Sequence, residues 1–185
     1  MVYRTKTYLA GEWTGDSDAI EKLYQWNEGD KWSLHFVDAH ANRQCYDTSK
    51  PCTIKDSLRD RMNRSKIFVL VVGSLTATAR KGSCVYQDCI NKEYNYFSSQ
   101  FYCRVGKAYS TQSFIEYECQ LAYNAYLKGE MKIVVLYNSV RVDKRKCPKI
   151  LQNIGNHVPM KCWKDGLWGN RYIDWDYPSV KTAII

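Results

Sequence analysis

The residue best placed to do chemistry is Glu118, a carboxylate inside the apolar stripe of a predicted helix. Residues 113–129 read as a helix, and at about 100° per residue its apolar side chains share one broad arc that includes Glu118. Glu116 falls outside that arc. An unpaired buried carboxylate costs several kcal/mol, so Glu118 needs a cavity, a ligand or a partner. A carboxylate in such a position is typical of a functional site.

The start of this helix accounts for one of its two carboxylates. Ser113 and Glu116 form a Ser-x-x-Glu capping box, which already provides the acid that complements the helix dipole. Glu118 lies deeper in the helix, where the dipole stabilises an acid less. Two interpretations of Glu118 therefore stay open: a functional group, or an acid at the edge of the core that reaches solvent or pairs with an arginine.

The elements that must position Glu118 alternate between strands and helices. Such alternation with short loops predicts an α/β fold, a three-layer sandwich around a parallel sheet of about five strands in the flavodoxin-like order 2-1-3-4-5. The apolar run 66–73 is the strand expected at the centre of the sheet. The other strands are predicted at 5–10, 33–37, 131–137 and 158–163, and the helices after Asp16 or Ser17, after a capping box at Thr53 and Asp56, at 113–129 and at 149–154.

Ligands of such sheets bind outside the carboxyl ends of the strands, where the strand order reverses. The start of the Glu118 helix emerges at the same edge. We therefore expect the following residues to contact a ligand beside Glu118: Ala10 and Gly11 after the first strand, Asp38 and His40 after the second, and Ser74 and Thr76 after the third.

One stretch interrupts the alternation, an insertion at about 77–112 that is rich in aromatic residues and cysteine. So many aromatic residues argue against disorder. Because the insertion follows the third strand at the ligand edge, we expect a lid or a contact in a homo-oligomer rather than a filler loop.

Composition limits the class of protein. With 185 residues, 45% hydrophobic and 25% charged, the chain is expected to form one globular domain over residues 1–185. The first residues lack the apolar core of a signal peptide, and no run approaches the length of a membrane span. We expect a cytoplasmic protein without a membrane partner.

Net charge and cysteine content indicate which ligands to expect and in which state the thiols are. The net charge is +8, yet the basic residues are spread along the chain, which favours an anionic small molecule such as a dinucleotide over nucleic acid. The eight cysteines contain no Cys-x-x-Cys, and the three histidines are scattered. We therefore expect reduced thiols rather than a metal site.

Several segments together resemble a known family, the TIR-like ThsB proteins of the bacterial Thoeris antiphage defence system. The resemblance covers roughly the first three quarters of the chain apart from the insertion. The segments that carry it are residues 6–11 (KTYLAG), 36–40 (FVDAH), 54–66 followed by the strand to Thr76, and 114–118 (FIEYE), which is similar to the family's Trp-Val-x-Tyr-Glu-Ile segment.

The resemblance implies a function and a catalytic residue. The family's catalytic glutamate follows tyrosine, which corresponds to Glu118, the residue that the helical arc selected independently. The implied reaction cleaves NAD, as substrate and not as cofactor, at the bond between nicotinamide and ribose and closes a cyclic ADP-ribose isomer. The cyclic product would be a signal that activates the Thoeris effector ThsA. A phage component would trigger the enzyme, which would be silent until then.

The chain departs from the family pattern at two places. Phe114 stands where the family prefers tryptophan, and Ala10-Gly11 replaces a Ser-Phe step whose aromatic ring could stack on the substrate. Trp13 is expected to take over that contact.

Two other functions fit part of the pattern. The segment 8–11 also resembles the opening of nucleoside deoxyribosyltransferases, whose glutamate attacks a deoxyribose. A TIR-like scaffold that assembles through its loops without catalysis is the second alternative.

Overall fold

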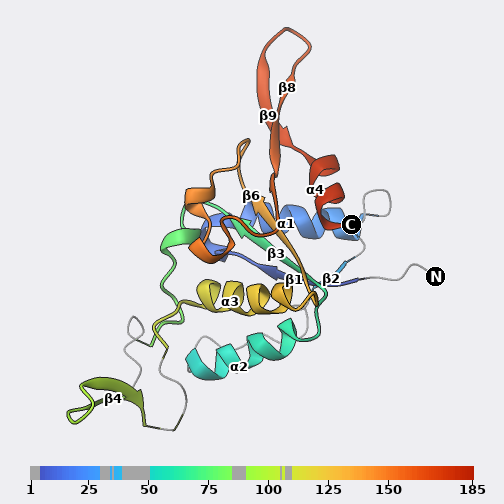
Figure 1. Ribbon diagram of the computed structural model, residues 1–185. Coiled ribbons are helices and arrows are strands. Elements are labelled where there is room, and N and C mark those ends of the chain that lie inside the picture. Colours follow the sequence, from blue (N-terminus) through green and yellow to red (C-terminus); the bar gives the residue numbers. More distant parts are fainter. Residues whose placement is uncertain are drawn as a thin grey trace.

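The computed structural model describes residues 5–29, 34, 36–38, 51–84, 91–104, 106 and 110–185. Its central strands are β1 (Thr5–Ala10), β2 (Phe36–Asp38), β3 (Ile67–Val72), β6 (Lys132–Tyr137) and β7 (Asn156–Pro159). They form one parallel sheet in the order β2-β1-β3-β6-β7 (Figure 1). Because β6 and β7 are the fourth and fifth strands of this sheet along the chain, the predicted order 2-1-3-4-5 is confirmed.

Helices cover both faces of the sheet (Figure 1). The main helices are α1 (Trp13–Glu28), α2 (Pro51–Met62), α3 (Phe114–Leu127) and α4 (Tyr177–Ile184). All six residues of β3 are buried. Val69 and Val71 pack into a core with α1 and α4, whereas Phe68 and Leu70 pack into a second core with α2 and α3. This double coverage explains the continuous apolar run of β3.

The predicted starts of the first two helices differ in outcome. Helix α1 is formed by two helical segments that meet at a kink at Asp16, with non-helical φ −126° and ψ 21°, so the predicted helix after Asp16 is present but is preceded by a helical turn that begins at Trp13. Helix α2 begins at Pro51, so Thr53 is not its N-cap. Proline favours the first position of a helix because its fixed φ matches the helix and its missing N–H would be unpaired there.

The capping box of α3 is confirmed. Ser113 Oγ accepts a hydrogen bond from the backbone N–H of Glu116 at 3.2 Å, and the Glu116 carboxylate accepts one from the N–H of Ser113 at 2.8 Å. At the other end, Gly129 follows the last turn with φ +71°. The sequence therefore fixes both ends of the helix that carries Glu118.

Between β3 and α3 the chain makes a short 3-10 helix, η1 (Thr76–Thr78), and an antiparallel hairpin of β4 (Lys92–Asn95) and β5 (Gln100–Cys103). The hairpin exposes aromatic side chains, above all Tyr96 and Phe97. Two backbone hydrogen bonds close the base of the insertion, from Cys84 N to Ser110 O at 2.9 Å and from Phe114 N to Lys81 O at 2.8 Å.

The C-terminal part differs from the prediction. A single 3-10 turn, η3 (Lys149–Leu151), stands where a short helix was expected near 149–154, and another 3-10 turn, η2 (Lys144–Lys146), precedes it. The strand expected at 158–163 is divided into β7, which ends at Pro159, and β8 (Lys161–Asp165). Strand β8 pairs with β9 (Arg171–Trp175) in a hairpin that projects from the body (Figure 1).

Candidate active site around Glu118

Glu118 is turned inward, as its position in the helical arc predicted. Only 5% of the residue is exposed, and it lies between Tyr117 and Cys119 on the side of α3 that packs on the sheet. The hydroxyl group of Tyr8, on β1, donates a hydrogen bond to Glu118 Oε1 at 2.5 Å. The carboxylate is therefore held against the first strand of the sheet.

Burial changes the acidity of this carboxyl group. Loss of hydration raises the pKa of Glu118 from 4.5 to about 7, and this increase is opposed by the hydrogen bond from Tyr8 and by the positive charge of Arg61 on α2. At neutral pH the group is therefore divided between its neutral and ionised forms. Perturbed carboxyl groups of this kind are concentrated in functional sites.

The structure brings only some of the predicted ligand residues toward Glu118. Ala10 is buried in the same core as Tyr8 and the inner face of α3. Gly11 follows β1, and a Cβ atom there would lie 3.3 Å from Ile20 and Val71 side-chain atoms. The backbone of Trp13 starts α1 and Asp38 ends β2, but their side chains lie outside the described part, as does His40 entirely.

The two hydroxyl residues after β3 lie in different surroundings. Ser74 is exposed. Thr76 is buried, and its Oγ1 accepts a hydrogen bond from the Gly73 N–H at 2.9 Å. Thr76 thus satisfies a backbone amide of the loop that follows β3.

A second buried carboxylate, Asp16, was not predicted as part of this edge. It is 1% exposed and packs on Gly73 so closely that a Cβ atom there would lie 1.8 Å from Asp16 Oδ1. Asn138, which follows β6, donates hydrogen bonds to Asp16 at 3.1 Å and to Asp18 at 2.9 Å. Burial is the main cause that raises the pKa of Asp16. The only signal in the sequence was Gly73 directly after β3.

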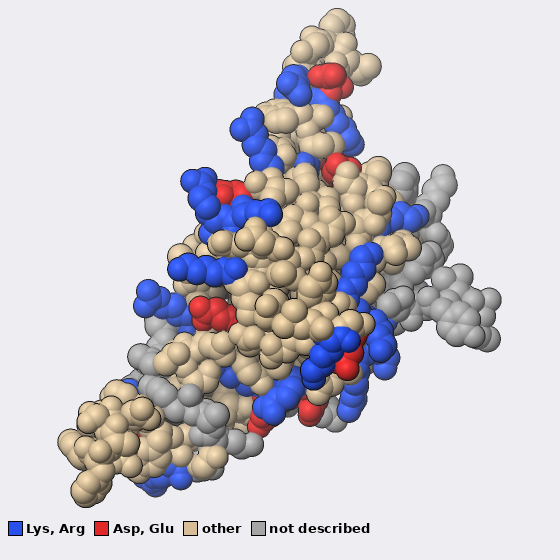
Figure 2. All heavy atoms as spheres, in the orientation of Figure 1, with Lys and Arg blue, Asp and Glu red and all other residues tan. Residues whose placement is uncertain are grey.

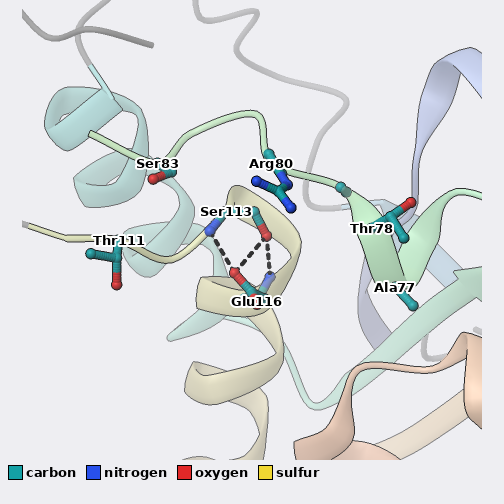
Figure 3. Close-up of a pocket in the computed structure, with 8 residues that line it drawn as sticks. Ala77, Thr78, Arg80, Ser83, Thr111, Ser113 and Glu116 are labelled. Atoms are coloured by element: carbon teal, nitrogen blue, oxygen red, sulfur yellow. Dashed lines mark hydrogen bonds between the residues drawn. The ribbon is translucent and has the colours of Figure 1, made fainter. Parts of the chain in front are cut away.

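The other flank of α3 borders a groove (Figure 3). One part of it is a cavity of about 490 Å³ bordered by Arg80, Ser83, Ser113 and Glu116, among others. The second part, of about 460 Å³, shares Ala77 and Glu116 and is also bordered by Arg145 and Lys149. Glu116 therefore faces this groove, whereas Glu118 faces the sheet.

Basic side chains are dispersed on the face drawn in Figure 2. Among the described residues, no group of three or more histidine, cysteine or acidic residues could hold a metal ion. The six described cysteines are free thiols. None of the helices in the described ranges is long and apolar enough to cross a membrane.

The sheet order, the two helical layers and the buried glutamate define the class of protein: a TIR-like α/β domain. Residues 8–82 match the family described as Thoeris protein ThsB, TIR-like domain. This match supports the resemblance for the segments that lie within residues 8–82. The match includes Tyr8 and the β1 and β3 loops but ends before α3. No curated protein matches the chain.

Proposed function

We propose that this Thoeris TIR-like protein cleaves NAD at the nicotinamide–ribose bond and converts the ADP-ribosyl part into a cyclic ADP-ribose isomer. The observation that supports this most is Glu118, a buried carboxylate at 5% exposure held by Tyr8 on the sheet. Ala10, Gly11, Trp13, Asp38, His40, Ser74 and Thr76 are the proposed substrate contacts. NAD is the substrate, and no bound cofactor is proposed.

The chemistry requires a fixed negative charge beside the ribose. When the bond between nicotinamide and C1′ of the ribose breaks, its electron pair leaves with nicotinamide, which becomes neutral. The sugar passes through an oxocarbenium-like state whose positive charge a nearby carboxylate stabilises. Glu118 performs this step in its ionised form.

Capture of the sugar cation decides the product. A hydroxyl group of the same ADP-ribosyl unit forms the new bond in cyclisation and releases its proton, whereas water gives ADP-ribose. A site that excludes water favours cyclisation. The insertion at 77–112 is proposed to provide this exclusion, and an unchanged ratio of cyclic to hydrolysed product after its deletion would contradict that role.

The product is proposed to act as a signal in the cytoplasm. It activates the Thoeris effector ThsA, so the two proteins communicate through the nucleotide. A phage component is the proposed trigger, and the resting enzyme is silent. The insertion is also a proposed contact in a homo-oligomer.

The test is incubation of purified protein with NAD, with and without lysate from phage-infected cells, followed by mass spectrometry of the products. We expect nicotinamide and a cyclic isomer from the triggered wild type and neither from Glu118→Gln. A parallel incubation with a deoxynucleoside and a free base tests the deoxyribosyltransferase alternative. Release of nicotinamide by a folded Glu118→Gln protein would overturn the proposal.

A scaffold function is the second candidate, because both hairpins expose large apolar side chains. Phe97 at one tip and Leu167 at the other are fully exposed, and Trp168 is 93% exposed. Exposed apolar clusters often mark contacts with other proteins. If the protein is only a scaffold, Glu118→Gln leaves antiphage protection intact.

A further inference from the structure

We propose that Tyr8 is the positioning residue of this site: its hydroxyl group orients the Glu118 carboxylate toward the sugar and favours the ionised form that the reaction needs. The inference rests on the proposed function for its catalytic consequence. The contact itself, from β1 to α3, joins residues 110 positions apart in the chain.

The position of the Tyr8 ring is fixed by the sheet. Tyr8 is 0% exposed and belongs to β1, which pairs with β2 on one side and β3 on the other. Its ring stacks on Phe68 of β3, with centroids 5.9 Å apart and planes inclined by 27°. Because the ring is packed on a central strand, its hydroxyl group is a fixed donor rather than a mobile one.

The hydroxyl group has a specific task at this position. Phenylalanine would supply nearly the same apolar packing, and a buried hydroxyl group without a partner destabilises a protein. The Tyr8 hydroxyl group has its partner here, because it donates a hydrogen bond to Glu118 Oε1 at 2.5 Å. A bond to one carboxylate oxygen limits rotation of the carboxylate and so sets the direction of the other.

The groups around Glu118 act in opposite directions. Burial favours the neutral acid, while Tyr8 from β1 and Arg61 from α2 favour the carboxylate and lower its pKa. On its own helix, Glu118 is followed by the buried thiol of Cys119, whose pKa is raised. Phe68 and Leu70 of β3 belong to the apolar core that the inner face of α3 covers. Tyr8 is therefore a neutral donor that favours the ionised form of Glu118.

The test compares Tyr8→Phe with a matched control, Tyr137→Phe. Tyr137 is also buried on the sheet, but its hydroxyl group bonds to His157 Nδ1 at 2.8 Å. Each variant is labelled with ¹³C-glutamate, and the Glu118 carboxyl signal, assigned by its absence in Glu118→Gln, is titrated by NMR. We expect the midpoint to move upward by about one pH unit in Tyr8→Phe and to stay in place in Tyr137→Phe.

The second measurement is the pH dependence of kcat for NAD cleavage in the triggered protein. In Tyr8→Phe, the acidic limb of the kcat–pH profile should move to higher pH by the same amount as the Glu118 titration midpoint. Activity at pH 7 should therefore fall severalfold and recover at higher pH. A merely structural role of Tyr8 would lower activity equally at every pH.

The outcomes separate the two proposals. An unchanged carboxyl titration in folded Tyr8→Phe overturns the positioning role, and so does a shifted titration with an unchanged pH profile of kcat. If the triggered wild type releases no nicotinamide, the proposed function fails, while the titration still shows whether Tyr8 controls Glu118.

Discussion

Helix α3 carries two carboxylates whose surroundings differ on its two flanks. Glu116 is exposed and accepts hydrogen bonds in the capping box beside a groove. Glu118 is buried against the sheet, where it accepts a bond from Tyr8 and has its pKa raised to about 7. Residues two positions apart lie on opposite sides of a helix. The face a carboxylate occupies, and not its residue type, therefore determines whether it stabilises the helix or can act on a substrate.

Changing each carboxylate to its amide tests most directly whether Glu116 and Glu118 differ in function. Glu118→Gln is expected to reduce NAD cleavage by about 10²–10³-fold, because the amide cannot stabilise the developing cation. Glu116→Gln is expected to leave the rate unchanged, since glutamine also completes a capping box. The measurement is the rate of nicotinamide release by triggered protein. Equal loss in both variants would show that the two flanks do not differ in function.

The pH dependence of stability gives the next largest effect. The folded pKa of Glu118 lies at about 7, above its value of 4.5 in the absence of burial. Between these values the native state holds a proton that the unfolded state has released, so stability falls as pH rises through the window, by about 3 kcal/mol in total.

Urea unfolding of wild type and Glu118→Gln at pH 5 and at pH 8 measures this contribution. The difference in unfolding free energy between the two pH values should be smaller in the variant by about 3 kcal/mol. Glu116→Gln serves as the control and should follow the wild type. A wild type and Glu118→Gln with parallel pH profiles would mean that Glu118 is not buried in solution.

The smallest effect concerns the cap. Ser113→Ala removes the oxygen that accepts the Glu116 N–H and should lower the unfolding free energy by about 1 kcal/mol. Chemical denaturation measures the loss, with the exposed Ser98 changed to alanine as control. The Glu118 titration should stay unchanged, and a shift in it would show that the two flanks are coupled.

The sequence predicted what depends on local periodicity. The apolar run of β3 and the arc that contains Glu118 are periodic patterns, and both are confirmed. The burial of Asp16 depends on contacts that no local pattern reveals, because Asn138 lies 122 positions away. Its close packing on Gly73 is likewise a product of the folded sheet.

The β8–β9 hairpin was missed for another reason. Sequence patterns assume that apolar residues face a core, but Trp163 and Ile173 are about half exposed and Leu167 at the tip is fully exposed. Gly166 and Gly169 mark the turn, where Gly166 N bonds to Asn170 O at 2.7 Å. These glycines were the available signal for a hairpin.

Contacts at the base of the insertion allow the residues beyond it to be exchanged. Backbone hydrogen bonds from Cys84 to Ser110 and from Phe114 to Lys81 bring the two ends of the insertion together. Gly82, with φ +98°, lies so close to the Phe114 ring that a Cβ atom on Gly82 would be 2.4 Å from it. Lys55 also holds the base of the insertion, because its Nζ donates a hydrogen bond to Ser110 Oγ at 2.8 Å. Residues 85–109 can therefore be replaced by a short linker, because these contacts at the base of the insertion still hold the chain at the start of α3. Such a replacement would separate the contribution of residues 85–109 to function from that of the α/β core.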